Sequence, residues 1–328
     1  MRDGIALIAF TDRGEVQAER LAAFLGGTAC RAGQALTLGQ WTEQNFRTRT
    51  GLVFVGAVGI AVRAVAPYLQ NKTEDPAVVV ADELGRFVIP LLSGHLGGAN
   101  RLAEDIAEFL GGTAVITTAT DLNGLFAVDL WAKAQNMLVL QPERIKQVSG
   151  KLLRGETVSI GCGWPILGNL PSNVRLGSAE DVLVDYRRHS TEALQLIPRN
   201  LTLGVGCRRG CEAETLEEGF ARFCEERGVR PEAVSAAASI DRKADEEGLL
   251  LFCERHDWKL HFFTAEELKS ATGDYSASLF VEAAVGVDHV CERAAVLDSG
   301  GALVESKYAG NGVTFALAEQ KTSFDWSW

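Results

Sequence analysis

The stretch Pro90-Leu-Leu-Ser-Gly-His-Leu-Gly-Gly-Ala-Asn100 decides the fold of the chain around it. Residues 87–92 form an apolar run that indicates a buried strand, and the run breaks into a glycine-rich loop holding His95. Residues 101–110 predict a helix, because leucine, isoleucine and alanine recur on one helical face before two glycines end it. A strand, a glycine loop and a helix in this order direct backbone N–H groups at an anion or an oxyanion.

Two interpretations of this loop are open. Gly94, Gly97 and Gly98 have no Cβ, so the backbone can approach a ligand closely, and a histidine there has a pKa suited to proton transfer. The alternative is an ordinary connection between a strand and a helix with His95 on the surface. The spacing alone favours neither interpretation.

Other apolar runs predict the fold class. They lack polar alternation, which is typical of parallel strands covered by helices on both faces. The predicted strands are residues 52–55, 77–81, 87–92 and 114–118. Because loops after parallel strands meet at the carboxyl edge of a sheet, we expect one crevice there. The loops expected around it are residues 11–14, 56–59, 82–83, 93–100 and 117–121.

Composition narrows the class of protein. The 328 residues are 47% hydrophobic and 23% charged, as in an ordinary globular chain of two or three domains. A net charge of −11 argues against nucleic acid or an anionic membrane as a partner. Seven cysteines without paired spacing indicate reduced thiols and a cytoplasmic location. Residues 51–69 are apolar, but Arg63 would cost about 2.5–3.5 kcal/mol in a bilayer, so we expect a strand, a turn and a helix there.

Several charged and glycine-rich positions can have either a functional role or an ordinary structural one. Arg63 is either a solvated helix charge or a clamp for a substrate carboxylate, and Asp121 can cap a helix as well as do chemistry. The turn Gly56-Ala-Val-Gly59 lacks the third glycine of a dinucleotide site, and no glycine loop continues into Gly-Lys-Ser/Thr. ATP and NAD are therefore not expected.

The C-terminal third predicts a second basic sheet edge. Residues 201–205 indicate a buried strand, followed by the loop Gly206-Cys-Arg-Arg-Gly-Cys211, and residues 234–240 indicate a strand that ends in Asp241-Arg-Lys243. Arginine and lysine in such turns suit carboxylate binding, although solvated surface charges are the alternative. Cys207 and Cys211 lack the spacing of a zinc site. The turn Gly310-Asn-Gly312 predicts a hairpin, and residues 321–328 read as a loose tail.

These segments together resemble the CbiG family. The N-terminal resemblance lies in residues 51–69, 75–82 and 90–100, and in Val115-Ile-Thr-Thr-Ala-Thr-Asp121. The C-terminal resemblance lies in Gly204-Val-Gly-Cys-Arg-Arg-Gly210, Ala238-Ser-Ile-Asp-Arg-Lys243 and Phe280-Val-Glu-Ala-Ala-Val-Gly-Val287. The stand-alone protein CobE is similar to this second part alone.

The resemblance implies an α/β fold and an activity. We expect an N-terminal three-layer αβα domain with a mostly parallel sheet (1–135), a small α+β middle region (136–200), a C-terminal αβα domain (201–320) and a tail (321–328). The implied activity is that of a cobalt-precorrin-5A hydrolase, which opens the δ-lactone of a cobalt-bearing tetrapyrrole with water and releases acetaldehyde. No cofactor or protein-bound metal is expected, because the substrate carries the cobalt. A homodimer is possible, and a tetrapyrrole-binding or carrier protein of the same pathway is the alternative function.

That chemistry assigns roles to the matching positions. His95 is the expected proton-transfer residue, or an axial ligand to the substrate's cobalt, and Asp121 orients it or acts as a second base. The N–H groups of Gly97 and Gly98 are the expected oxyanion donors. The expected substrate-binding residues are Gly56, Gly59, Arg63, Ser93, Gly94, Gly97, Gly98, Asn100, Thr117, Thr118, Arg208, Arg209, Arg242 and Lys243. We expect the histidine loop and the arginine-bearing turns to face one cleft.

Overall fold

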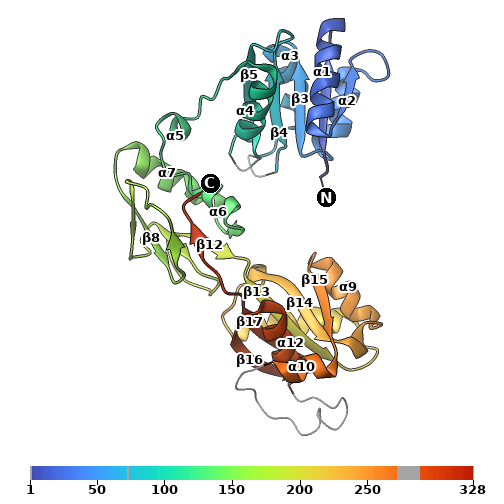
Figure 1. Ribbon diagram of the computed structural model, residues 1–328, viewed down its shortest axis with the longest axis vertical. Helices are drawn as coiled ribbons and strands as arrows, with labels where there is room; N and C mark the ends of the chain where they lie inside the picture. Colours follow the sequence, from blue (N-terminus) through green and yellow to red (C-terminus); the bar gives the residue numbers. More distant parts are fainter. Residues whose placement is uncertain (1, 72–73, 96, 272–288, 328) are drawn as a thin grey trace. The chain divides into compact units, whose positions relative to one another are not determined.

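The computed structural model describes residues 2–71, 74–95, 97–271 and 289–327. The chain forms two compact units, of which unit 1 comprises Met1–Leu130 with Leu152–Arg154, and unit 2 comprises Trp131–Lys151 with Gly155–Trp328. Both units are α/β structures built on mostly parallel sheets, so the predicted fold class is confirmed (Figure 1).

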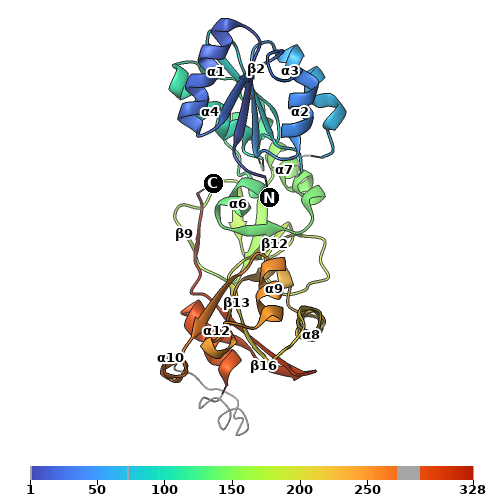
Figure 2. The ribbon, with the colours of Figure 1, turned by 90° about the vertical axis from the view of Figure 1, so that its right-hand side faces the viewer.

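Unit 1 is a three-layer αβα structure with the sheet order β2-β1-β3-β4-β5-β6. The strands are β1 (Ile5–Ala9), β2 (Thr28–Arg31), β3 (Gly51–Val55), β4 (Ala77–Ala81), β5 (Phe87–Leu92) and β6 (Thr113–Ala114). The helices are α1 (Asp12–Leu25), α2 (Leu38–Phe46), α3 (Val58–Val65), the 3-10 helix η1 (Ala66–Tyr68), α4 (Ala99–Leu110), α5 (Ala119–Leu122) and α6 (Val128–Ala134), which continues into unit 2. Two apolar cores fill the layers: α1 and α4 cover one face of the sheet, and α2 and α3 cover the other (Figure 2).

The direction of β5 differs from the one on which the predicted single crevice depends. Strands β1 to β4 are parallel, but β5 runs antiparallel to β4, with Val78 opposite Leu92 and Ala81 opposite Val88. A tight turn reverses the chain, and the Asp82 carboxylate stabilises it by accepting hydrogen bonds from the N–H groups of Leu84 and Phe87.

The loops of unit 1 therefore divide between two edges of the sheet. The loops at residues 93–98 and 115–121 follow β5 and the parallel strand β6, and they lie where β4 begins. The loops at residues 11–14, 56–59 and 82–83 lie at the other edge, about 16 Å away along a five-residue strand. The expectation of one crevice around all five loops is wrong.

Apolar residues 51–69 form β3, α3 and η1, as the sequence predicts. Within the described ranges of the chain, none of the helices is both long and apolar enough to cross a membrane.

Unit 2 contains two five-stranded sheets. The first has the order β10-β8-β11-β12-β7, in which only β7 is antiparallel to its neighbour. Its strands are β7 (Met137–Val139), β8 (Val158–Cys162), β10 (Val174–Leu176), β11 (Val182–Val184) and β12 (Leu194–Pro198). The 3-10 helix η2 (Pro142–Arg144) and helix α7 (Ile145–Leu153) connect β7 to β8.

The second sheet of unit 2 has the order β15-β14-β13-β17-β16. Its strands are β13 (Leu201–Cys207), β14 (Val234–Ile240), β15 (Lys259–Phe263), β16 (Ala302–Gly310) and β17 (Val313–Glu319). Its helices are α8 (Ala213–Glu226), η3 (Pro231–Ala233), η4 (Asp241–Lys243), α9 (Glu247–Arg255), α10 (Ala265–Ser270) and α12 (Val290–Ser299). Helices α8 and α9 pack on one face and α10 and α12 on the other (Figure 2).

Two connections of this sheet agree with the sequence. Strands β13 and β14 are parallel, so the loops after them share one edge, as predicted for the two basic turns. The predicted hairpin joins β16 to β17, and its turn residues Asn311 and Gly312 have φ angles of 51° and 80°. Positive φ at both positions is what a tight two-residue hairpin turn requires.

The C-terminal residues correct another expectation. Strand β18 (Phe324–Asp325) pairs with β9 (Ile166–Leu167), and Trp326 is only 8% exposed. The Trp131 indole N–H donates a hydrogen bond of 2.6 Å to the Asp325 carbonyl oxygen, and the Trp131 and Trp326 rings stack with centroids 5.3 Å apart. The expectation of a loose tail is therefore wrong, because two aromatic side chains anchor the segment in unit 2.

Candidate functional site

The glycine loop between β5 and α4 is folded tightly on itself. A Cβ atom on Gly97 would lie 2.2 Å from the Ser93 Cβ, and one on Gly94 would lie 2.7 Å from the Asn100 Oδ1. Ser93 itself has a left-handed φ of 57°. The missing side chains at Gly94 and Gly97 are thus needed for the loop's own packing, which is how the sequence brings His95 to a defined place.

Backbone hydrogen bonds inside this loop limit the expected oxyanion site. The Gly98 N–H donates to the His95 carbonyl at 2.9 Å, and the Asn100 N–H donates to the Gly94 carbonyl at 3.0 Å. The Gly98 N–H would have to give up or share this hydrogen bond to serve as an oxyanion donor. For both Gly97 and Gly98 that role stays a prediction.

His95 lies between two carboxylates. Its Nε2 atom is 3.2 Å from Asp121 Oδ2, and its Nδ1 atom is 3.5 Å from Asp129 Oδ1. Asp121 is on the short helix α5, and Asp129 is in the first turn of α6. The side chain of Asp129 is only 7% exposed, compared with 16% for His95 and 26% for Asp121. One carboxylate is therefore buried beside the imidazole, and the other is partly exposed.

Asn100 holds the more open carboxylate in place. Its Nδ2 group donates to Asp121 Oδ2 at 2.6 Å and lies 3.3 Å from the Thr118 hydroxyl oxygen. Asn100 is the second residue of α4, so the rigid helix fixes the amide. The structure thus brings together four of the predicted site residues, namely His95, Asn100, Thr118 and Asp121. Their roles in catalysis and substrate binding stay predictions.

The charges of this cluster favour the protonated imidazole. The hydrogen bond to Asp129 is the largest cause that raises the pKa of His95, and the Asp121 charge adds to it, while burial acts in the opposite direction. Burial alone would raise the pKa of Asp129, but the hydrogen bond and charge of His95 outweigh it and lower that pKa. The cluster therefore stabilises an imidazolium that can donate a proton.

Three predicted residues of unit 1 lie elsewhere. Gly56 and Gly59 follow β3, at the sheet edge opposite the His95 loop, and Arg63 is exposed on α3. Helix α3 packs on the opposite face of the sheet from α4. The structure therefore does not bring these residues to His95. Thr117 is exposed in the loop after β6, on the same edge as His95.

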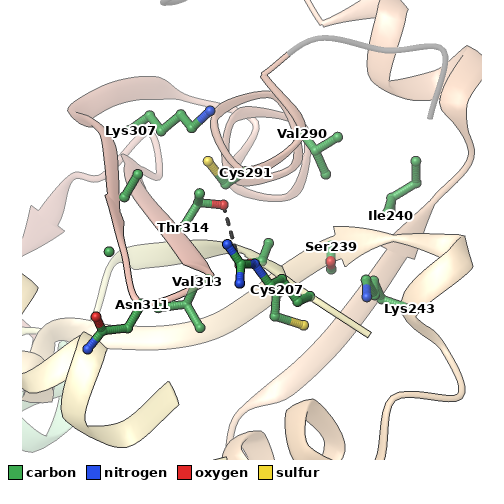
Figure 3. Close-up of a pocket in the computed structure, with 15 residues that line it drawn as sticks. Cys207, Ser239, Ile240, Lys243, Val290, Cys291, Lys307, Asn311, Val313 and Thr314 are labelled. Carbon is green, nitrogen blue, oxygen red and sulfur yellow. Dashed lines mark hydrogen bonds between the residues drawn. The ribbon is translucent and has the colours of Figure 1, made fainter. Parts of the chain in front are cut away.

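Unit 2 contains a pocket of about 530 Å³ at the edge where β13 and β14 end. It is lined by the loop after β13, the end of β14, the start of α12 and the β16–β17 hairpin (Figure 3). The predicted residues Arg208 and Lys243 line it, together with Lys307, Cys291 and Asn311, to which the sequence assigned no role in a site. Lys307 and Lys243 lie on opposite sides of the view in Figure 3, with Thr314 and Ser239 between them.

The other predicted arginines of unit 2 are outside this pocket. Arg209 lines a neighbouring depression, where its guanidinium pairs with Asp245 at 2.6 Å. Arg242 is exposed in η4. Lys243 makes an ion pair of 3.0 Å with Glu246, whose carboxylate is 5% exposed.

Sequence reasoning missed Asp129 and Lys307. Asp129 could have been noticed, because it is a single acidic residue within the apolar run of residues 126–132. Lys307 gave no such signal, since it lies inside a strand of mixed polarity. Residues 280–287, which carry part of the resemblance, lie outside the described residues.

The fold and these two groups of side chains define an α/β protein with a histidine–carboxylate cluster in one unit and a basic pocket in the other. Two protein-family models match this chain: "Cobalamin synthesis G N-terminal" over residues 40–121 and "Cobalamin synthesis G C-terminus" over residues 201–318. The chain belongs to the CbiG family of cobalamin synthesis proteins.

Relatives of known name span most of the chain. It is 36% identical to the cobalt-precorrin-5A hydrolase of Salmonella typhimurium, over 96% of this chain and 97% of that protein. It is 30% identical to the protein of that name from Priestia megaterium, over 83% and 79% of the two chains. The crystal structure of CobE, a protein from the cobalamin (vitamin B12) biosynthetic pathway, is 32% identical with a TM-score of 0.35, over 38% of this chain and 92% of that chain.

Proposed function

We propose that this protein is a cobalt-precorrin-5A hydrolase, which opens the δ-lactone of a cobalt-bearing tetrapyrrole with water and releases acetaldehyde. Family membership and the names of relatives that span the chain support the substrate and the reaction class. The observation that carries the chemistry is the imidazole of His95 between the carboxylates of Asp121 and Asp129.

The first step is lactone hydrolysis, which needs a base to activate water and an acid for the leaving oxygen. Asp121 is the more exposed carboxylate, so it takes a proton from the attacking water. The two carboxylates raise the pKa of His95 and favour its imidazolium form, and that form donates a proton to the alkoxide oxygen as the ester bond breaks. One water is consumed, and the products are a carboxylic acid, which loses its proton to the solvent, and a secondary alcohol on the macrocycle.

The second step releases the two-carbon fragment. His95 has become neutral by giving up its proton, so it can now accept the proton of the new hydroxyl group. The bond between the carbinol carbon and the macrocycle then breaks, and its electron pair passes to the conjugated ring, which takes up at that carbon the proton that Asp121 removed from the water. The hydroxyl-bearing fragment leaves as acetaldehyde.

Asp129 acts on this chemistry through His95 as a positioning residue. It is the buried partner of Nδ1, so it fixes the ring orientation and leaves Nε2, next to Asp121, as the reacting nitrogen. Both ring nitrogens thus have a carboxylate partner. Axial ligation of the substrate's cobalt by His95 would break one of these contacts, so proton transfer is the role we propose.

An acetaldehyde assay tests this function. Full-length protein is mixed with the cobalt-bearing lactone, and acetaldehyde is followed by its reduction with alcohol dehydrogenase and NADH. We expect His95→Gln to bind the lactone like the wild type and to lose about 10²–10⁴-fold in rate. His189→Gln is the matched control, because His189 also pairs with an aspartate, Asp185, at 2.8 Å in unit 2, and it should leave the rate unchanged.

The same assay separates the alternative function. A tetrapyrrole carrier would bind the lactone with equal affinity and form no acetaldehyde above the uncatalysed rate. That result would exclude the hydrolase, and wild-type turnover by His95→Gln would remove His95 from the mechanism.

A further inference from the structure

The pocket of unit 2 combines cations with apolar walls. Among the described residues that line it, three are basic and none is acidic, although the whole chain carries a net charge of −11. Ile240, Val290 and Val313 supply apolar surface. A volume of about 530 Å³ lies within the usual range for small-molecule sites, so the pocket is large enough for part of a macrocycle with one of its side chains.

The cations of the pocket are unequally neutralised. Lys243 is paired with Glu246, whereas Arg208 and Lys307 have no carboxylate within ion-pair distance among the described residues. Burial raises the pKa of the thiols of Cys207 and Cys291 to about 11, so these two groups stay uncharged and do not offset the cations. Among the described side chains that line the pocket, the charges therefore sum to a positive value, which favours an anion as the ligand.

The hairpin turn holds Arg208 in place. The Arg208 N–H donates to the Gly312 carbonyl at 3.0 Å, and a Cβ on Gly312 would lie 2.9 Å from the Arg208 Cδ. Gly312 has a φ of 80°, so only glycine fits this position without strain. Contact with the stem of Arg208 limits its rotamers, which lowers the entropy that binding an anion would cost.

A hydrogen bond of its backbone N–H group fixes the position of Lys307 in β16. Its N–H donates to a carboxylate oxygen of the fully buried Glu292 at 2.8 Å, which ties the edge strand β16 to α12. The Lys307 side chain is partly buried at the pocket rim. A fixed strand position and a flexible stem allow its ammonium to reach a ligand in the pocket.

We propose that this pocket binds a carboxylate-bearing side chain of the tetrapyrrole, an acetate or a propionate, through Arg208 and Lys307. The identity of the macrocycle rests on the proposed function. The apolar walls contact the edge of the ring, and the two cations select an ionised carboxylate over a neutral ester or amide at that position.

The experiment measures binding to the full-length protein. The probes are dicyanocobyrinic acid, a cobalt corrin whose side chains end in carboxylates, and its neutral methyl ester. Binding is followed by the change in the corrin absorbance. We expect Lys307→Gln to weaken binding of the acid about tenfold and Arg208→Gln combined with Lys307→Gln to weaken it about 30-fold or more. Affinity for the ester should change less than twofold.

The matched control is Lys259→Gln. Lys259 is exposed on β15, the edge strand opposite β16 in the same sheet, and it does not line the pocket. The substitution therefore removes the same charge as Lys307→Gln at a site outside the pocket. The affinity of this variant for the acid should equal that of the wild type. Equal binding of the acid by wild type and Lys307→Gln, or an equal loss for acid and ester, would overturn the proposal.

The result is independent of turnover. If the protein forms no acetaldehyde but discriminates acid from ester through Lys307, the proposed hydrolase function is wrong and the proposed carboxylate-binding pocket is supported. If acetaldehyde forms and Lys307→Gln has an unchanged KM, the function stands and the pocket proposal fails.

Discussion

The Nδ1 atom of His95 lies 3.5 Å from a carboxylate oxygen of Asp129, which is buried at the start of α6. The two residues are far apart in sequence, and only the fold brings them together. Because Asp129 is the more buried of the two partners of His95, its charge is the less screened by water, and the imidazole depends on it for the proton at Nδ1.

Replacing Asp129 with asparagine should lower the pKa of His95, because the hydrogen bond to Asp129 is the largest cause of its elevation. The check is an NMR titration of the His95 imidazole, assigned by the loss of its signal in His95→Gln. The pH at which acetaldehyde release is half-maximal should move in the same direction. An unchanged pKa would contradict the electrostatic role of Asp129, whereas a merely structural role would change stability alone.

The stability of unit 1 should depend on pH through the same group. The pKa of His95 is higher in the folded chain than in the unfolded chain, so the protonated form stabilises the fold. The stability difference between wild type and His95→Gln should be fully present below the unfolded pKa of about 6.5 and disappear as pH rises through the folded pKa. Urea unfolding followed by Trp41 fluorescence at several pH values measures it, and a difference that grows with pH would contradict the assignment.

Two glycines of unit 1 should respond oppositely to alanine. At Gly97 the new Cβ would lie 2.2 Å from the Ser93 Cβ, so Gly97→Ala should destabilise unit 1 by about 2 kcal/mol or more. At Gly59, inside α3, a Cβ meets nothing within 4 Å, so Gly59→Ala should stabilise by about 0.5–1 kcal/mol. Urea unfolding of both variants tests the pair, and a stable Gly97→Ala protein would show that the loop packs differently.

The C-terminal anchor should contribute to the stability of unit 2. Trp326 stacks on Trp131 and is 8% exposed, so Trp326→Ala should cost about 3–5 kcal/mol. Lys321→Ala, at an exposed position of the same segment, is the control and should change stability by less than about 0.5 kcal/mol. Thermal unfolding measures both, and equal melting temperatures for Trp326→Ala and wild type would contradict the anchoring.

The sequence predicted where strands and helices lie more accurately than whether neighbouring strands run parallel or antiparallel. The apolar run of β5 is the same whether the strand is parallel or antiparallel, so composition could not reveal the reversal. The connection of residues 82–86 could have revealed it, because five residues are too few for a parallel crossover. Such a short connection favours an antiparallel pair, which places the loops after β4 and β5 at opposite edges of the sheet.

The candidate site was only partly predictable, because some of its residues are brought together by tertiary packing and strand pairing. His95, Asn100 and Asp121 belong to two glycine- and threonine-rich segments with a distinct pattern, and the structure places them in contact. Asp129 and Lys307 reach their positions through the packing of α6 and the pairing of β16, and neither relationship is visible in local sequence.

A single-turnover experiment tests the central role of His95 most directly. Wild type and His95→Gln, each in excess over the cobalt-bearing lactone, are mixed with it, and acetaldehyde is measured over time at one pH. We expect one acetaldehyde per lactone from the wild type and a rate about 10²–10⁴-fold lower from His95→Gln, with both proteins binding all of the substrate. Equal rates from the two proteins would contradict this role of His95.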